Sequence, residues 1–410
     1  MTDGDQQGAT ARWLCSPEAG PPIADARAMA ARHPNDPLAT AADFRRAHPT
    51  LASERAAAVL EQAALAEMAG RRYGISGDWR LTRDGLEAAT RPDVARRRAG
   101  MVVASGATRV VDLTGGLGFD TRAFLDAGLE VTAVERDPIT AAFLEFNCPG
   151  VLAIVADARD ELPGLIARLA EGDVVFVDPA RRDPAAARDA RTGRARPERD
   201  PERWSPPWSF VAGIGHPRVL AKVAPGFRPP AAWWAEWIGV DRTVVECAVA
   251  SWPMADGMRR AVSLAGDGEA VAIARTDAAA TTSTPLAWIH EPDPAVVQAG
   301  ALDSLAVDLR LSRIDRASTW LTGPEPARTP LVRSYETLAV LSGSSRDQRR
   351  QVAALGLRRL TAKTRDVDVT PDKALRSLGV AEGPDAVLVL TRESGRLLSL
   401  LARPASAPAP

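Results

Sequence analysis

The sequence predicts an α/β protein built on a doubly wound parallel sheet, with an N-terminal helical cap and a small C-terminal α+β domain. Short apolar runs recur between residues 109 and 178, and an acid follows each of them: Asp112, Glu135, Asp157 and Asp178. Such runs are typical of strands buried on both faces of a parallel sheet. Helix-like segments separate the runs, and a glycine cluster follows the first. This alternation predicts the doubly wound arrangement.

The first strand leads into a turn that is suited to ligand binding. Three glycines follow the apolar run 110 to 113 at once: Gly115, Gly116 and Gly118. Glycines there allow a sharp turn into a helix, expected over 120 to 127, and a close approach of a ligand to the main chain. The second strand ends at Glu135, twenty residues after Gly115, where an acid can accept hydrogen bonds from both ribose hydroxyls.

The glycine spacing separates two classes of ligand. A dinucleotide fingerprint requires the pattern G-x-G-x-x-G, in which the third glycine packs the helix on the strand. Here Phe119, Asp120 and Thr121 follow Gly118, and no glycine recurs before Gly128. The dinucleotide hypothesis is therefore weakened, and a glycine turn without any ligand is the third possibility.

The remaining strands complete the predicted sheet. We expect a helix over 138 to 146, a strand over 151 to 155, a helix over 162 to 170 and a strand over 173 to 178. Ligands of open parallel sheets lie outside the carboxyl ends of the strands, so Asp112, Glu135 and Asp178 define one expected cleft. Further strands are expected at 219 to 223 and within 233 to 250, followed by an antiparallel hairpin of 260 to 264 with 269 to 274.

An arginine-rich run follows the fourth strand. Residues 183 to 207 are poor in apolar side chains, and the arginines of the run are Arg188, Arg191, Arg194, Arg196, Arg199 and Arg203. We expect a mobile loop there. Such a loop can close over a phosphodiester backbone by bidentate contacts, or it can be a solvated insertion, and both hypotheses stay open.

The flanking regions complete the predicted domains. Residues 1 to 35 are expected to be loose or partly helical, 43 to 71 helical, and Thr90 the N-cap of a helix that continues to 98. The C-terminal unit is expected to contain strand 332 to 341, helix 345 to 355, strand 358 to 364, helix 371 to 377, and strands 386 to 391 and 396 to 402. The predicted boundaries are 1–100 for the helical region, 101–276 for the sheet domain, 277–331 for a connecting region and 332–405 for the α+β domain.

Composition limits the partners and the location. No apolar run approaches the roughly 18 residues of a membrane span, and the N-terminus does not resemble a signal peptide, so we expect a cytoplasmic protein without a membrane partner. The three cysteines have no metal-ligand spacing, so no metal is expected. Residues 333 to 403 carry 13 basic and 8 acidic side chains, a balance of +5 in a chain of net charge −1. This basic unit indicates either a polyanionic partner or a solvated charged face.

Taken together, these parts resemble the bacterial class I S-adenosylmethionine-dependent methyltransferases that carry a C-terminal THUMP-like domain. The resemblance covers roughly residues 75 to 403. It rests on the stretch 81 to 90, on Asp112-Leu-Thr-Gly-Gly-Leu-Gly-Phe-Asp-Thr121, on Val177-Asp-Pro-Ala-Arg-Arg182, and on the basic tail around 385 to 400. It implies a Rossmann-like sheet, S-adenosylmethionine as cofactor and, because THUMP domains are associated with RNA-modifying enzymes, an RNA substrate.

The resemblance also implies roles for particular residues. Asp112 and the turn residues Thr114, Gly115, Gly116 and Gly118 would face the methionine part of the cofactor, and Glu135 the ribose. The carboxylate of Asp157 and the backbone N–H of Ala158 would meet the adenine. The implied catalytic residues are Asp178, Pro179 and Arg181.

The fourth motif bears on the chemistry. Amino-group methyltransferases typically show Asp/Asn-Pro-Pro-aromatic, whereas Ala180 and Arg181 stand here after Asp178 and Pro179, which puts adenine-N6 chemistry in doubt. The Asp-Pro-x-Arg form looks closer to RNA uridine-C5 methyltransferases, which need a cysteine nucleophile. Cys247 is the only cysteine late enough in the sheet, and it is either that nucleophile or part of the core. Alternatively, catalysis rests on proximity alone.

Three functions are compatible with the sequence. The favoured one is an S-adenosylmethionine-dependent methyltransferase that acts on a base of ribosomal or transfer RNA. The first alternative is a regulatory or RNA-binding protein that binds the cofactor without turnover, and the second is an NAD-dependent dehydrogenase.

Overall fold

The computed structural model describes residues 3–181, 198–255, 257–264 and 270–405. The chain divides into two compact units. The first comprises Met1–Val223 with Ala250–Met254, and the second Ala224–Val249 with Ala255–Pro410. No helix in the described ranges is both long enough and apolar enough to cross a membrane.

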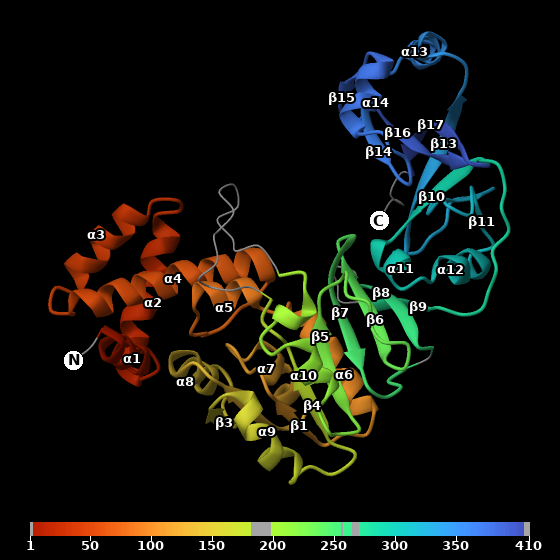
Figure 1. Ribbon diagram of the computed structural model, residues 1–410. Helices are drawn as coiled ribbons and strands as arrows, with labels where there is room; N and C mark the ends of the chain where they lie inside the picture. Colours follow the sequence, from red (N-terminus) through yellow and green to blue (C-terminus); the bar gives the residue numbers. More distant parts are fainter. Residues whose placement is uncertain (1–2, 182–197, 256, 265–269, 406–410) are drawn as a thin grey trace. The chain divides into compact units, whose positions relative to one another are not determined.

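The first unit begins with a helical region (Figure 1). Its elements are α1 (Asp3–Leu14), η1 (Pro17–Ala19), α2 (Gly20–Arg32), α3 (Pro37–Ala47), α4 (Ser53–Tyr73), α5 (Arg83–Ala88) and α6 (Pro92–Ala104). The start of the chain is therefore more helical than expected. The single helix expected over 43 to 71 is wrong, because the chain breaks between α3 and α4. Pro49 explains the break, since it lacks an N–H and disfavours helical geometry at His48.

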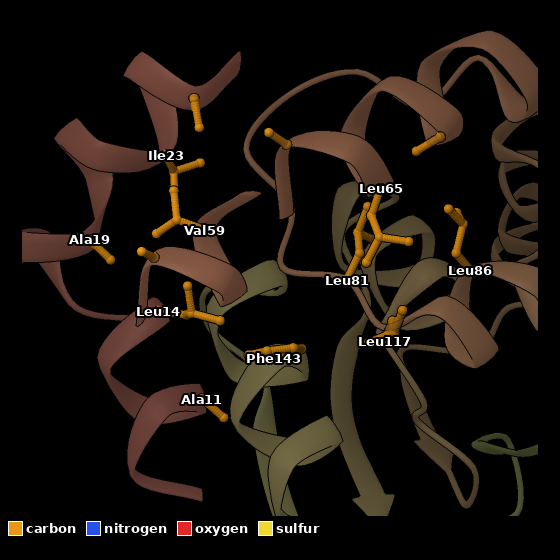
Figure 2. Close-up of a cluster of buried hydrophobic side chains, with 14 of the residues drawn as sticks. Ala11, Leu14, Ala19, Ile23, Val59, Leu65, Leu81, Leu86, Leu117 and Phe143 are labelled. Atoms are coloured by element: carbon orange, nitrogen blue, oxygen red, sulfur yellow. The ribbon is translucent and has the colours of Figure 1, made fainter. Parts of the chain in front are cut away.

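The core of this helical region reaches the sheet domain. Figure 2 shows Ile23, Val59 and Leu65 of the helical region in one buried cluster with Leu117 and Phe143. Leu117 lies in the glycine turn, and Phe143 lies in the helix after the second strand. The helical region therefore packs onto the glycine turn after the first strand. Burial of the apolar surface between them stabilises this packing.

A parallel sheet forms the centre of the first unit. Its strands are β1 (Arg109–Asp112), β2 (Glu130–Glu135), β3 (Leu152–Val155), β4 (Val174–Val177) and β5 (Val219–Val223), and they run in the order β3-β2-β1-β4-β5. All four pairings are parallel. The chain moves outward from β1 to β3 and then returns to the other side of β1. Because parallel crossovers are right-handed, the two halves place their helices on opposite faces, which confirms the doubly wound prediction.

Helices connect these strands. They are α7 (Phe119–Asp126), α8 (Pro138–Asn147), α9 (Ala158–Ile166), η2 (Pro201–Arg203) and α10 (Trp208–Ala212). The helix expected over 162 to 170 begins four residues earlier, because the Asp157 carboxylate accepts a hydrogen bond from the Arg159 N–H and caps α9.

The second unit begins with β6 (Trp234–Val240), β7 (Thr243–Ala250), β8 (Arg259–Leu264) and β9 (Ala270–Ala274). Strand β6 pairs in parallel with β8, and β8 pairs with β9 in the expected antiparallel sense.

An eight-stranded sheet with four helices completes the second unit. Its elements are β10 (Trp288–Pro292), α11 (Pro294–Gln298), α12 (Leu302–Asp308), β11 (Ser312–Arg313), β12 (Leu321–Gly323), β13 (Val332–Leu341), α13 (Ser345–Ala354), β14 (Arg359–Thr364), α14 (Pro371–Leu378), β15 (Ala381–Glu382), β16 (Ala386–Glu393) and β17 (Arg396–Pro404). The strand order is β11-β12-β10-β13-β17-β16-β14-β15. The elements after residue 331 match the expected ones closely.

Residues 288 to 323 are more than a connection. Strand β10 pairs with β13 along five residues, and Ile289 and Trp320 are buried together with Tyr335 and Val389. The segment expected to connect two domains therefore supplies three strands of the C-terminal sheet and part of its core. The domain boundaries stay a prediction.

Candidate functional site

Three acids gather at the carboxyl ends of neighbouring strands. In the parallel register Asp112 of β1 is paired with Ala133 of β2 and with Phe176 of β4. Glu135 and Asp178 each come two residues later, at the carboxyl ends of the two strands that flank β1. Burial raises the pKa of Asp112 to about 6, and the nearby carboxylates of Asp178 and Glu135 add to the rise. An acidic edge favours a positively charged ligand and opposes a pyrophosphate.

The glycine turn is fixed to the second strand. The Gly116 N–H donates to Glu135 Oε2 at 3.0 Å, and the Asp137 N–H donates to Glu135 Oε1 at 2.9 Å. These bonds orient the carboxylate, and each oxygen keeps a lone pair for a further donor such as a hydroxyl. Gly118 has φ +88°, and a Cβ there would lie 2.4 Å from Cys148 Sγ, so only glycine fits.

Asp112 holds the turn from inside. Its side chain is almost fully buried and accepts hydrogen bonds from the Thr114 N–H at 3.0 Å and from Thr121 Oγ1 at 2.7 Å. The Thr114 hydroxyl in turn accepts a bond from the Asp178 N–H at 2.6 Å. The turn residues thus connect the first and fourth strand ends, and the contact of Asp112 and Thr114 with the methionine part stays a prediction.

Asp157 lies at the end of β3 and is paired with Arg159. The guanidinium donates to both carboxylate oxygens, at 3.0 and 2.7 Å, and these hydrogen bonds are the main reason that the pKa of Asp157 falls to about 2. The pair is largely exposed, so a ligand that hydrogen-bonds to Asp157 would lose little energy by weakening the ion pair with Arg159. The adenine contacts of Asp157 and Ala158 stay predictions.

The fourth strand end carries the expected catalytic residues. Asp178 Oδ2 accepts a hydrogen bond from Lys222 Nζ at 2.6 Å. Pro179 is buried, and the Arg181 carbonyl accepts from the Glu198 N–H at 2.7 Å. Arg188, Arg191, Arg194 and Arg196 of the arginine-rich run lie outside the described residues.

Lys222, on β5, is a residue of this site that the sequence did not predict. Its side chain is 7% exposed and, besides Asp178, it donates to Thr90 Oγ1 at 2.8 Å and to the Ala88 carbonyl at 3.5 Å. One signal was present in the sequence: only three of the 51 basic residues are lysines, namely Lys222, Lys363 and Lys373. A lysine within an apolar strand is unusual in a chain this rich in arginine. Its position therefore indicates a specific role for its ammonium group.

Thr90 is not the N-cap that its sequence position predicted. Arg91 is the N-cap of α6, and the Thr90 hydroxyl donates to Asp120 Oδ2 at 2.6 Å. Arg98 contacts the other oxygen of Asp120, and both side chains are buried. A buried carboxylate requires such partners, which outweighs the local capping preference. The result is a continuous chain of hydrogen bonds from Asp178 through Lys222 and Thr90 to Asp120.

We expect this buried pair to matter for stability. Asp120→Ala removes the buried carboxylate that contacts the Arg98 guanidinium and accepts from the Thr90 hydroxyl, and it should lower the free energy of unfolding by about 3 to 5 kcal/mol. Asp126→Ala is the matched control, because it breaks the exposed pair with Arg122 and should cost under about 1 kcal/mol. Urea unfolding followed by circular dichroism measures both; similar losses in the two variants would contradict the assignment.

Cys247 belongs to the core of the second unit. It is fully buried in β7, and burial raises its pKa well above the usual value, so the reactive thiolate is not available. The described ranges also contain no group of three or more histidine, cysteine, aspartate or glutamate residues able to hold a metal ion.

Comparisons with known proteins agree with this geometry. The family model described as "THUMP domain-like" matches residues 332–404. An uncharacterized S-adenosylmethionine-dependent methyltransferase of Mycobacterium tuberculosis is 28% identical over 339 residues, which are 80% of this chain and 88% of that protein. The crystal structure of a "putative methyltransferase" from Porphyromonas gingivalis W83 has a TM-score of 0.69 at 18% identity and covers 94% of this chain and 98% of its own.

The chain is a relative of S-adenosylmethionine-dependent methyltransferases. It carries a THUMP-like domain at its C-terminal end. The predicted resemblance, the enzyme class with its cofactor and the Rossmann-like fold class are confirmed by these matches. The similarity to the solved structure concerns the fold alone, and the predicted roles of individual residues stay predictions.

Proposed function

We propose that this protein acts in the cytoplasm and transfers a methyl group from S-adenosylmethionine to a base of ribosomal or transfer RNA. The observation that carries the proposal is the presence, in one chain, of an acidic strand edge with a glycine turn and of a THUMP-like domain. The resemblance to THUMP-bearing enzymes supports RNA as substrate, and the +5 balance of residues 333 to 403 agrees with it. Three free cysteines agree with a reducing compartment.

The residues at this edge fit the cofactor. When bound, S-adenosylmethionine supplies an electrophilic methyl group on a positively charged sulfur. The carboxylates of Asp112, Glu135 and Asp178 provide negative charge beside the glycine turn, which suits the two positive charges of the ligand. Glu135 is oriented by two backbone N–H groups and is the residue we assign to the ribose.

Two measurements test the proposal. Calorimetry with S-adenosylmethionine and with NAD should show binding of the first alone, and binding of NAD alone would favour a dehydrogenase. Tritiated methyl groups should then be transferred to an RNA fraction in preference to protein or DNA fractions. Cofactor binding without transfer to any fraction would support a regulatory protein instead.

Glu135 offers a test of cofactor binding by itself. Glu135→Ala removes two hydrogen bonds to a charged acceptor and leaves the ribose hydroxyls unpaired, so S-adenosylmethionine binding should weaken by about 1 to 3 kcal/mol. Calorimetry measures the change. Glu130→Ala, an exposed acid at the opposite end of the same strand, should leave the affinity unchanged. Parent affinity in a folded Glu135→Ala protein would remove the ribose assignment.

A further inference from the structure

Lys222 is placed to control how Asp178 meets a substrate. A lysine ammonium has three N–H donors and no acceptor. Here three acceptors surround it: Asp178 Oδ2, Thr90 Oγ1 and the Ala88 carbonyl. The ammonium is therefore held as a donor inside the protein, which makes it unsuited to take a proton from a substrate.

The direction of the hydrogen bonds follows from this donor. Because Lys222 can only donate, the Thr90 hydroxyl must accept from it and can give its own proton only to Asp120 Oδ2, at 2.6 Å. Arg98 contacts the other carboxylate oxygen of Asp120. The position of the lysine is thus set by a buried network that includes Arg98 of α6 and Asp120 of α7.

Asp178 keeps one carboxylate oxygen for another partner. Its backbone N–H is held by Thr114 at 2.6 Å, and its Oδ2 by Lys222 at the same distance. No side chain or backbone group within the described ranges donates to Oδ1, and the side chain is 24% exposed. A carboxylate fixed at two points, with one free oxygen at the strand end, is suited to accept a proton from a bound group.

We propose that Lys222 is a positioning residue that fixes Asp178 so that its Oδ1 accepts the proton of an N–H or O–H group, the group that becomes methylated. The inference rests on the proposed function and narrows its substrate to a nitrogen or oxygen nucleophile. Methylation of a pyrimidine carbon would need a thiolate, and the buried Cys247 does not supply one.

The step balances without a further reactant. The lone pair of the substrate nitrogen or oxygen forms the bond to the methyl carbon, and the carbon–sulfur bond breaks with its electron pair going to sulfur. The substrate proton passes to Asp178 Oδ1, and from there to water. The ammonium of Lys222 stabilises the carboxylate before the step and does not touch the reacting atoms.

Lys222→Met tests the positioning role, because methionine keeps most of the volume and removes the charge. We expect kcat for methyl transfer to fall roughly 10- to 100-fold, with the affinity for S-adenosylmethionine changed less than about twofold. A fall in kcat without a matching change in KM or in cofactor affinity distinguishes a mispositioned reacting group from a defect in binding. The variant retains the other charged groups described at this site, namely Asp112, Glu135 and, beyond Thr90, Asp120 with Arg98.

A double-mutant cycle separates positioning from a merely structural role. In an Asp178→Asn background, Lys222→Met should cost little more, because the group that it positions is already lost. Arg168→Met, which removes an exposed charge from the same unit, is the matched control and should behave like the parent. A parent kcat in Lys222→Met, or losses that multiply fully in the double variant, would overturn the proposal. Finding the methyl group on a carbon of the product nucleoside would also overturn it.

A second readout does not depend on RNA. With ¹⁵N-labelled lysine the chain gives at most three ammonium signals, from Lys222, Lys363 and Lys373. We expect Lys222→Met to remove one slowly exchanging signal and Asp178→Asn to shift that same signal. If the parent methylates no RNA but shows this behaviour, the proposed function fails while the positioning of Asp178 by Lys222 stands. A Lys222 signal that exchanges rapidly and keeps its chemical shift in Asp178→Asn would overturn the positioning role.

Discussion

Asp178→Asn should lower the rate of methyl transfer by at least about 100-fold while the protein still binds S-adenosylmethionine and RNA. The substitution keeps the size of the side chain and an oxygen that accepts from Lys222. It removes the charge and places an NH₂ donor where the substrate proton must be accepted. Single-turnover transfer with the cofactor and RNA in excess measures the chemical step separately from binding.

The control for this variant is Asp126→Asn, an exposed acid in the same unit that pairs with Arg122. It should retain the parent rate. If Asp178→Asn also retains the parent rate with intact folding, Asp178 has no catalytic role, and the site must be sought elsewhere at the strand edge.

Replacing four exposed arginines of the THUMP-like domain should weaken RNA binding by at least about tenfold at low salt. The positions are Arg346, Arg358, Arg376 and Arg396, each changed to alanine. Each lost contact with a phosphate also removes about 0.7 from the slope of log affinity against log salt for single-stranded RNA. Binding measured at several salt concentrations should therefore give a shallower line for the variant.

The matched control removes the same charge from the first unit, at the exposed Arg45, Arg46, Arg71 and Arg72. It should leave both affinity and slope unchanged. Equal losses in the two variants would mean that RNA is held by unspecific charge rather than by the THUMP-like domain. Deletion of residues 333 to 403 is a poorer test, because β10 pairs with β13 and their core is shared.

The sequence was sufficient for the strand edge because its signals are local. The run before Asp112, the glycine turn and the spacing to Glu135 lie within 30 residues, and the geometry of a parallel sheet brings the strand ends together. The C-terminal elements could be predicted for the same reason: a capped helix separates β13 from β14, and another separates β14 from the strands after it, as with Ser344 and Asp347 at the start of α13.

What the sequence could not predict depends on contacts between distant residues. Lys222 meets Thr90 across 132 positions and Asp178 across 44, and no spacing rule connects them. Thr90 is a residue type that favours the N-cap position, but its hydroxyl donates to the buried carboxylate of Asp120, 30 residues away. Residues 288 to 323 belong to the C-terminal sheet because β10 pairs with β13. The strands of this segment are short and lack a regular apolar–polar alternation, so the sequence does not predict that pairing.

The most direct test of the central claim is the nucleoside composition of RNA methylated by this protein. RNA from a strain lacking the gene is treated with S-adenosylmethionine and either the parent protein or Asp178→Asn, and then digested and analysed by mass spectrometry. We predict one methylated nucleoside, modified on nitrogen or oxygen, that the parent produces and Asp178→Asn does not. No new methylated nucleoside with the parent, in RNA that lacked the protein throughout growth, would contradict the assignment of an RNA methyltransferase.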